Sequence, residues 1–304
     1  MRTTGKTQGA NPPWMRLRTP AKVSVTLQVL ARRKDGYHSV RLVLFPVSLY
    51  DTLRLQSAPG IPLSLEVDSA EDLGPVEKNL VWRAARNFER AAGVALQAKF
   101  HLTKRIPSGS GLGSGSGNAA GTLMALNALH GHPLSPQALL AEAATLGSDV
   151  PFFIAARPAL CEGRGEVLTP LERVPRLVLL VVKPGLSIET AGAYRALAEA
   201  RAGRPAPAPA PLPDLTTVDA VAAALHNDFE PLLCARHPGL AEIRARLLAE
   251  GALGAVLTGS GAAVFGVFRE RPQRDRAAER LDREGRWTIL PCETLVDHSY
   301  DFES

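Results

Sequence analysis

Residues 107–123 read PSGSGLGSGSGNAAGTL, in which glycines alternate with small residues at Gly109, Gly111, Gly113, Gly115 and Gly117. Glycine lets a backbone adopt positive φ and approach a ligand closely, and the interleaved serines add short hydroxyl donors. The helical spacing of Leu123, Leu126 and Leu129 predicts a helix that begins where the glycines end, at Asn118, and stops at Gly131. Because free N–H groups at a helix N-terminus bind anions, the stretch predicts a phosphate-binding loop.

Other glycine-rich loops were weighed against this interpretation. A flexible linker, or a tight turn between a strand and a helix, also uses Gly and Ser. A Walker A loop needs Lys and then Ser or Thr after its last glycine, and no Lys follows here until far downstream. The dinucleotide fingerprint fits only at residues 115–120, without the acidic residue expected about 20 positions later. Both of these known phosphate loops are therefore excluded, and the linker stays open.

Composition limits the classes of function. The chain has 304 residues, enough for two domains, with 45% hydrophobic, 21% charged and 5% aromatic residues, as in a folded globular protein. Its net charge is +5 and its pI about 9.3, but the arginines are interleaved with Glu and Asp. No basic block carries aromatic residues, which argues against a nucleic-acid partner.

The cysteines and the N-terminal residues indicate where in the cell the protein is expected. Cys161, Cys234 and Cys292 are odd in number and lack metal-like spacing, so we expect them to be reduced and buried in a cytoplasmic protein. No apolar run approaches the ~20 residues of a membrane span, and the first residues lack the apolar core of a signal peptide. Residues 1–15 are expected to form a disordered leader.

The first half of the chain alternates strands and helices. Period-two spacing over residues 23–29, followed by Lys34-Asp35-Gly36, predicts an antiparallel hairpin. It places Lys22 and His38 within reach of one site, although a solvated lysine and an ordinary polar contact are the simpler interpretations. Strands are expected at 63–67 and 96–106, and helices at 79–93 and 135–146.

Asp149 stands immediately before the apolar run VPFF. A carboxylate there cannot easily follow the run into a core, so it is either a helix cap or a site residue.

The second half is expected to be α+β. Residues 161–166 predict a turn, residues 170–176 a domain boundary, and LVLLVV at 177–182 a fully buried strand. The Pro/Ala-rich residues 202–213 predict an exposed, stiff loop. Helices are expected at 218–225, 239–250 and 272–283, a strand, glycine turn and strand at 254–266, and a last strand at 287–290.

Three blocks in fixed order resemble the GHMP kinase superfamily: PAKVSVTLQV at 20–29, the glycine loop, and LTGSGAAVFG at 257–266. The resemblance runs from about Arg18 to the C-terminus. It implies the α+β GHMP kinase fold, with an N-terminal ribosomal S5-like α/β domain (16–172) that carries the ATP loop. A C-terminal ferredoxin-like α+β domain (173–304) would follow, and the active site would lie between the two.

Further blocks narrow the resemblance: RRKDGYHSV, NLVWRAARNF, LGSDVPFF, GRGE, KPGLSIETAGAY and NDFEP. They are similar to the branch that phosphorylates 4-diphosphocytidyl-2-C-methyl-D-erythritol in non-mevalonate isoprenoid biosynthesis. The implied reaction transfers the γ-phosphoryl group of ATP to the 2-hydroxyl of this cytidyl substrate and uses Mg²⁺. The implied partners are small molecules, with no nucleic acid and no membrane, and the protein would be a monomer or homodimer.

The resemblance also implies roles for individual residues. Asp149 would be the catalytic aspartate and Lys22 its partner. ATP would be bound by the loop residues Pro107, Ser108, Gly109, Ser110, Gly111, Leu112, Gly113, Ser114, Gly115, Ser116, Gly117 and Asn118, with Asn79 and Lys104 near the adenine. The cytidyl substrate would be bound by Ser24, Tyr37, His38, Thr190, Tyr194, Gly259, Ser260 and Gly261. Metal ligands are not assigned.

Two positions depart from the family pattern. Ser24 replaces the usual Asn, a longer side chain, so the same contact would need a water. The usual paired serines late in the loop appear as Ser116-Gly117, which removes one hydroxyl.

Competing functions are another GHMP kinase, such as homoserine or mevalonate kinase, a nucleotide-binding regulator without catalysis, and a basic RNA-binding protein. The DGYH block disfavours the first competitor, and the presence of both Lys22 and Asp149 disfavours the second.

Overall fold

The computed structural model describes residues 13–303. The leader expected at residues 1–15 lies almost entirely outside the described residues, and the first strand begins at Met15. Across the described residues, none of the helices combines the length and apolar character that crossing a bilayer requires. Cys161 and Cys292 are buried, Cys234 is half-buried, and all three are free thiols.

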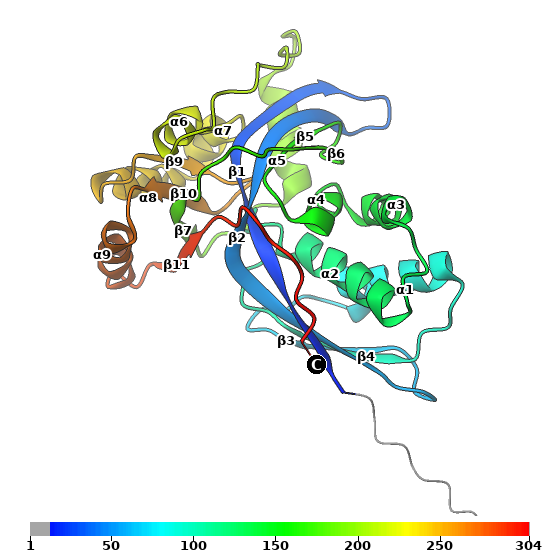
Figure 1. The fold of residues 1–304 in the computed structure, drawn as a ribbon. Helices are drawn as coiled ribbons and strands as arrows, with labels where there is room; N and C mark the ends of the chain where they lie inside the picture. The colour runs from blue at the N-terminus through cyan, green and yellow to red at the C-terminus, as the bar shows by residue number, and fades with distance from the viewer. Residues whose placement is uncertain (1–12, 304) are drawn as a thin grey trace, which may run out of the picture.

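A long hairpin organises the larger sheet (Figure 1). Strands β1 (Met15–Arg32) and β2 (His38–Ser57) pair antiparallel, and the predicted Asp-Gly turn joins them with Gly36 at φ 86°. The seven-stranded sheet has the order β3-β4-β2-β1-β8, and β5 and β6 extend it from β2. The bounds of the added strands are β3 Ser64–Asp68, β4 Ala98–Thr103, β5 Ala159–Glu162, β6 Val167–Pro170 and β8 His226–Asn227.

Four helices lie on one side of this sheet (Figure 1): α1 Leu80–Ala92, α2 Ser114–Leu129, α3 Pro136–Leu146 and α4 Val150–Ala155. A 3₁₀ turn, η1 (Val76–Lys78), precedes α1. Their caps follow the sequence signals. The Asn79 side chain accepts from the Val81 N–H, Gly93 ends α1 in the left-handed region, and the Ser135 hydroxyl accepts from the Ala138 N–H. These boundaries confirm the predicted helices at 79–93 and 135–146.

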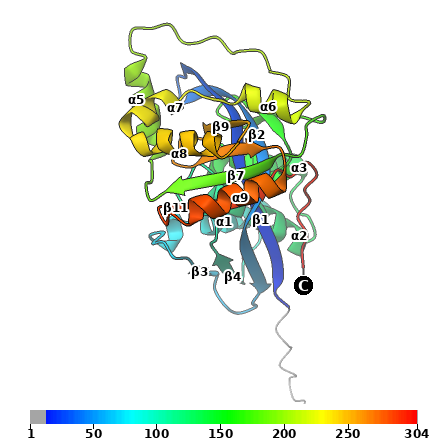
Figure 2. The same ribbon diagram turned by 90° about the vertical axis from the view of Figure 1, so that its left-hand side faces the viewer.

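The smaller sheet is antiparallel with the order β11-β7-β10-β9. The run LVLLVV forms most of the central, buried strand β7, as predicted. Helices α8 and α9 cover one face of this sheet, and Figure 2 shows them in front of it. The bounds are β7 Val178–Pro184, β9 Gly254–Leu257, β10 Val264–Phe268, β11 Trp287–Glu293, α8 Pro238–Ala249 and α9 Arg271–Asp282.

Three shorter helices complete this half: α5 Thr190–Ala200, α6 Val218–Ala224 and α7 Glu230–Arg236. The sequence reasoning missed α5 and α7, and it assigned Cys161 and Glu162 to a turn although both belong to β5. Residues 202–213 form the exposed, irregular connection that was predicted.

The two sheets are linked at several points. Strand β8, from the second half, pairs parallel with β1 through Leu27 and Asn227. Past β11, the chain returns to the first half of the molecule, where the Tyr300 hydroxyl donates to the Phe153 carbonyl of α4 at 2.7 Å. The division at 172/173 stays a prediction, with β8 crossing it.

The helix after the glycine loop begins earlier than predicted. It starts at Ser114 with Gly113 as its N-cap, not at Asn118, so Gly115 and Gly117 lie inside it. A Cβ on Gly117 would lie 2.6 Å from the Pro20 carbonyl oxygen on β1. This glycine therefore allows close packing of the helix on the strand, a need that local sequence does not display.

Candidate active site

One cavity of about 1180 Å³ lies where the glycine loop, the β1–β2 turn, α5 and the β9–β10 turn meet. Most predicted site residues line it: Lys22, Tyr37, His38, Asn79, Lys104, Pro107, Ser108, Gly109, Ser110, Gly111, Gly113, Ser114, Gly115, Ser116, Asn118, Asp149, Thr190, Tyr194, Gly259 and Ser260. Four do not: Ser24, Leu112, Gly117 and Gly261. The fold thus brings the three resemblance blocks to one place.

The glycine loop is fastened to the β9–β10 turn. Gly109, Gly111 and Gly113 all have positive φ, between 58° and 77°. The Gly109 carbonyl accepts from the Ala262 N–H at 3.2 Å, and a Cβ on Gly111 would lie 2.2 Å from the Thr258 carbonyl oxygen. Glycine is required here for the approach of a neighbouring segment as well as for any ligand. This ordered packing overturns the linker interpretation.

Lys22 and Asp149 form an ion pair, with Nζ 3.5 Å from Oδ2. Glycines confine the lysine, because a Cβ on Gly113 would lie 3.1 Å from its Cε and one on Gly259 would lie 3.3 Å from its Nζ. The Lys22 side chain is buried, so it is not a solvated surface lysine. The ammonium is therefore held in one place at the floor of the cavity.

Asp149 occupies the N-cap position of α4 but makes no capping hydrogen bond with its side chain. Its carboxylate is one-third exposed and faces the cavity. The capping alternative therefore loses its physical basis, and the carboxylate is free to accept a proton from a bound hydroxyl group.

Ser24 lies behind Lys22 and is fully buried. Its hydroxyl accepts from Lys22 Nζ at 3.4 Å, and its N–H donates to Thr258 Oγ1 at 3.0 Å. Despite being shorter than Asn, it reaches the lysine directly. Ser24 therefore holds Lys22 in place and does not line the cavity in which it was predicted to bind substrate.

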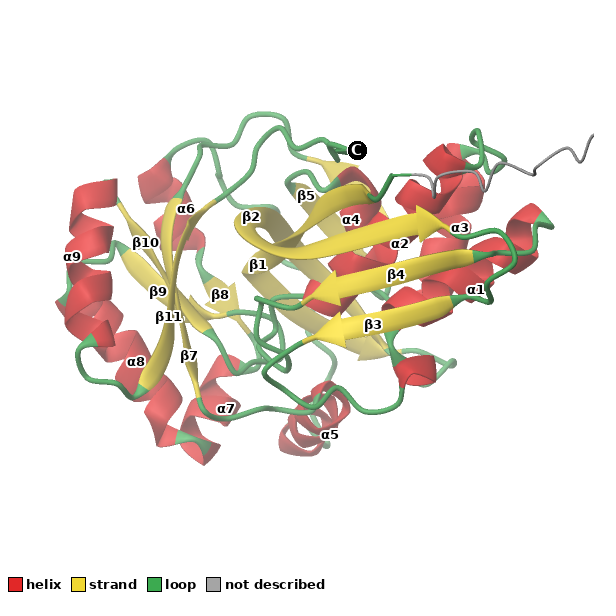
Figure 3. Cartoon of the chain, turned by 90° about the horizontal axis from the view of Figure 1, so that it is seen from below, coloured by secondary structure: helices red, strands yellow, loops and turns green. Residues whose placement is uncertain are grey.

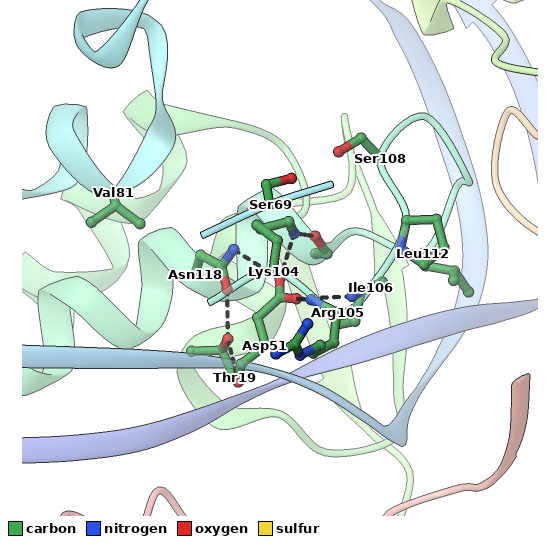
Figure 4. A network of polar contacts seen from close by, with 12 residues as sticks. Thr19, Asp51, Ser69, Val81, Lys104, Arg105, Ile106, Ser108, Leu112 and Asn118 are labelled. Carbon is green, nitrogen blue, oxygen red and sulfur yellow. Dashed lines mark hydrogen bonds and ion pairs between the residues drawn. The ribbon is translucent and has the colours of Figure 1, made fainter. Parts of the chain in front are cut away.

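A buried carboxylate that the sequence reasoning missed fixes the start of α2 (Figure 4). Asp51 Oδ2 accepts from Lys104 Nζ at 2.5 Å and from Asn118 Nδ2 at 3.0 Å, while Oδ1 accepts from the backbone N–H groups of Arg105 and Ile106. Lys104 also contacts the hydroxyl of Ser114, the first residue of α2. Asp51 is fully buried, so the network compensates its charge and ties β2, the β4 end and α2 together.

The opposite end of the cavity is aromatic. The rings of His38 and Tyr194 stack with centroids 5.4 Å apart and an interplanar angle of 21°, and Phe229 packs edge-on against Tyr194. Tyr37 is 55% exposed, with the Arg164 guanidinium 5.0 Å from its ring centroid. Flat faces beside an exposed ring suit a planar base.

Burial and nearby charge act on the groups at this end. Burial, with the positive charges of Arg32 and Arg201, lowers the pKa of His38. Burial, with the negative charge of Asp149, raises the pKa of Tyr194. Both rings are therefore uncharged near pH 7.

The remaining predicted residues fall into two groups. Thr190 begins α5, and its hydroxyl lies 2.9 Å from that of Ser260 in the β9–β10 turn. Asn79 lines the same cavity as the apolar side chains of Leu73, Leu80 and Leu102. Apolar side chains suit an adenine ring.

Three cavity-lining arginines were not predicted: Arg32, Arg164 and Arg195. Arg164 lay inside the GRGE block, so the signal for it was present. A second, smaller cavity of about 450 Å³ shares Tyr37, Ser148 and Arg164 with the first. Positive charge thus gathers at the aromatic end.

Comparisons with known proteins find relatives of both halves of this chain. Residues 79–157 match the GHMP kinases N terminal domain, and residues 212–286 match the GHMP kinases C terminal domain. A 4-diphosphocytidyl-2-C-methyl-D-erythritol kinase from Geobacter sp. (strain M21) is 38% identical over 92% of this chain and 99% of its own length. One from Pelotomaculum thermopropionicum is 41% identical over 86% of this chain and 92% of its own length.

Solved structures extend the comparison. A crystal structure of 4-(cytidine 5'-diphospho)-2C-methyl-D-erythritol kinase has a TM-score of 0.74 and 35% sequence identity, and it covers 92% of this chain and all of its own. A homoserine kinase from Cytophaga hutchinsonii has a TM-score of 0.73 at 16% identity, covers 99% of this chain and 100% of its own, and shares the fold alone.

Proposed function

The chain belongs to the GHMP kinases, in the family of 4-diphosphocytidyl-2-C-methyl-D-erythritol kinases, and we propose that it transfers the γ-phosphoryl group of ATP to the 2-hydroxyl of 4-diphosphocytidyl-2-C-methyl-D-erythritol. This is a step of non-mevalonate isoprenoid precursor biosynthesis. The observation that carries the proposal is the Lys22–Asp149 pair, which lies in one cavity with both the glycine loop and the His38–Tyr194 stack.

The geometry supports an orientation for both substrates. The cytosine base of the cytidyl substrate binds at Tyr37, His38 and Tyr194. The adenine of ATP binds near Asn79 and the leucines that line the cavity. The ATP phosphates lie along the glycine loop, where backbone N–H groups and the positive end of the α2 dipole favour anions. Asp149 stands between the two ends and receives the hydroxyl that reacts.

The reaction needs a proton acceptor and charge stabilisation. Asp149 accepts the proton of the substrate 2-hydroxyl as the hydroxyl oxygen forms a bond to the γ-phosphorus of ATP. The bond between that phosphorus and the β–γ bridging oxygen breaks, and ADP leaves. Lys22 stabilises the negative charge that develops on the attacking oxygen. Thr190 and Ser260 place hydroxyl groups beside the reacting group, and the backbone of Gly259 closes the phosphate side.

Mg²⁺ is expected from the chemistry of phosphoryl transfer, where it neutralises phosphate charge. Among residues 13–303, no group of three or more His, Cys, Asp or Glu side chains is placed to hold a metal ion. Mg²⁺ in kinase sites is bound by one or two carboxylates together with the substrate phosphates. The Ser116 hydroxyl lines the cavity in the first turn of α2 and would hold Mg²⁺ together with the ATP phosphates, while Asp149, paired with Lys22, stays available as the proton acceptor.

A coupled ADP-release assay with the purified protein tests the proposal. We expect ADP formation with the cytidyl substrate and none above background with homoserine or mevalonate. Activity with either of the latter, and none with the cytidyl substrate, would assign the chain to another GHMP activity.

We also propose a cytoplasmic protein that acts as a monomer or homodimer on small molecules. Size-exclusion chromatography with light scattering tests the oligomeric state, and cell fractionation tests the location.

A further inference from the structure

Helix α5 carries two site residues but has a small apolar anchor. Thr190 is its first residue and Tyr194 lies one turn later, yet its fully buried residues are only Ala193, Ala196 and Leu197, with Tyr194 partly buried against Phe229. Figure 3 shows α5 at the edge of the molecule, away from the helices that cover the sheets. The exposed Pro/Ala-rich connection follows directly. Apolar contacts alone therefore hold this helix in place only weakly.

Arg201, at the C-cap of α5, supplies a polar anchor. Its Nη1 donates to the Val29 carbonyl on β1 at 2.7 Å, and its Nη2 lies 2.8 Å from Asp228 Oδ2. The two contacts use both arms of the planar guanidinium, which fixes direction as well as distance. The last turn of α5 is thereby attached to the central hairpin.

Asp228 is itself held firmly. Its Oδ2 accepts from the Val29 N–H at 2.8 Å, and its Oδ1 lies 2.8 Å from His226 Nε2. Its side chain is 12% exposed, against 31% for Arg201. Burial by itself raises the pKa of Asp228, but the hydrogen bonds from Arg201, the Val29 N–H and His226 outweigh it and lower the pKa below the ordinary value. The carboxylate is therefore a fixed anion beside β1.

The anchoring point lies on the strand that leads to the base-binding turn. Val29 pairs with Val40, and Arg32 pairs with His38 across the hairpin. A link from α5 to Val29 thus sets the distance between α5 and His38. The Arg201 charge also contributes to lowering the pKa of His38, which agrees with their proximity.

We infer that Arg201 and Asp228 form a positioning pair that fixes α5 against β1, and so sets the His38–Tyr194 stack that binds the base of the cytidyl substrate. The inference rests on the proposed function. Neither residue touches substrate; both act through Tyr194. Loss of the pair lets α5 shift, which weakens base binding and leaves the ATP site and the Lys22–Asp149 pair unchanged.

The test compares Arg201→Met with Arg201→Lys and with Arg204→Met, which removes the same charge from an exposed position three residues later. Steady-state kinetics with the cytidyl substrate should show about a tenfold rise in KM for Arg201→Met, comparable to the loss of one aromatic contact. The kcat and the KM for ATP should stay within about twofold, because Arg201 holds the C-terminal end of α5, whereas Thr190 at its first residue is held separately by the Ser260 hydroxyl. Arg201→Lys should recover part of the loss, and Arg204→Met should behave as the parent does.

A double-mutant cycle shows whether Arg201 acts through Tyr194. In a Tyr194→Ala background, Arg201→Met should add less than about twofold to KM. An equal added loss in both backgrounds, or an unchanged KM in the single variant, overturns the inference. If Arg201→Met unfolds below the assay temperature, Asp228→Asn is used in its place, because it removes the same ion pair. The same rise in KM is expected of it, and an unchanged KM overturns the inference. Parent activity with the cytidyl substrate is measured first, so failure of the proposed function is seen separately.

Discussion

The Nζ atom of Lys22 lies 3.5 Å from Oδ2 of Asp149, and the two side chains differ in exposure, 4% against 33%. The lysine is enclosed by glycines of two loops, whereas the carboxylate opens toward the cavity. One partner is therefore a fixed charge and the other is accessible to a substrate hydroxyl. This difference is what a positioned proton acceptor requires.

Asp149→Asn should lower kcat by roughly 10²–10⁴-fold, the usual range for loss of a positioned proton acceptor, and leave ATP affinity largely intact. Because the side chain makes no capping bond, no capping energy is lost, and any fall in thermal stability should come from leaving the buried Lys22 ammonium without its anionic partner. The matched control is Ser135→Ala, which removes a real cap on α3. It should cost about 1 kcal/mol of stability with no change in kcat. Turnover near that of the parent in Asp149→Asn would remove Asp149 from the mechanism.

Gly111→Ala should weaken ATP binding and lower stability by about 1–3 kcal/mol, because the position has φ 77° and a Cβ would lie 2.2 Å from the Thr258 carbonyl oxygen. Gly115→Ala is the control. It lies within α2, where a Cβ would meet only Leu80 Cδ1 at 3.4 Å, so its stability should stay within about 0.5 kcal/mol of the parent. Nucleotide titration and thermal melts measure both effects. Equal stability of the two variants would contradict the packing argument.

Asp51→Ala should destabilise the protein by about 3–5 kcal/mol, because it leaves Lys104 buried without its anionic partner. Denaturant unfolding measures this loss. Asp68→Ala removes a comparable ion pair, to Arg105 at 3.8 Å, from an exposed place, and should change stability by less than about 1 kcal/mol. A small loss for Asp51→Ala would show that the network of Figure 4 contributes little.

Tyr194→Ala should raise the KM for the cytidyl substrate about tenfold or somewhat more, since an aromatic pair contributes ~0.5–1.5 kcal/mol beyond its buried area. The KM for ATP should not change, and kcat should stay similar if base contacts act as uniform binding energy. Tyr194→Phe keeps the ring and should stay near the parent value. Tight binding of the cytidyl substrate by Tyr194→Ala would refute the assignment of the base site.

The KM for the cytidyl substrate should depend on pH through His38. Burial, Arg32 and Arg201 lower the pKa of this imidazole below its ordinary value of 6.5, so the neutral ring is the form present at pH 7. KM should be flat above pH 6.5 and rise as pH falls through the lowered pKa, where the imidazolium adds positive charge and loses a hydrogen-bond acceptor. His38→Ala should raise KM and abolish this dependence. Persistence of the same pH profile in that variant would exclude His38 as its cause.

The lowered pKa of His38 also makes the free energy of unfolding depend on pH. Between the lowered pKa of folded His38 and 6.5, the unfolded chain binds more protons than the folded chain. The contribution of His38 to stability is therefore present above pH 6.5 and is lost as pH falls below it.

Local sequence patterns determined the elements whose signals are local. The Asn79 and Ser135 caps, the Gly93 stop and the Asp35-Gly36 turn depend on backbone geometry within a few residues, and the structure confirms each. The alternation along β1 and the apolar run of β7 likewise reflect periodic burial of side chains. The family blocks identified many of the residues that line the cavity, although not Arg32, Arg164 or Arg195.

Only the tertiary structure decided questions of burial and distant contact. Asp149 makes no capping bond, Lys22 is enclosed, and α2 begins at Ser114 with Gly117 packed close to β1. Asp51 gave no signal in the sequence, since a carboxylate within a strand resembles a surface residue until its partners from β4 and α2 surround it. Such contacts join segments far apart in the chain, and their free energy depends on desolvation and direction, which no local pattern encodes.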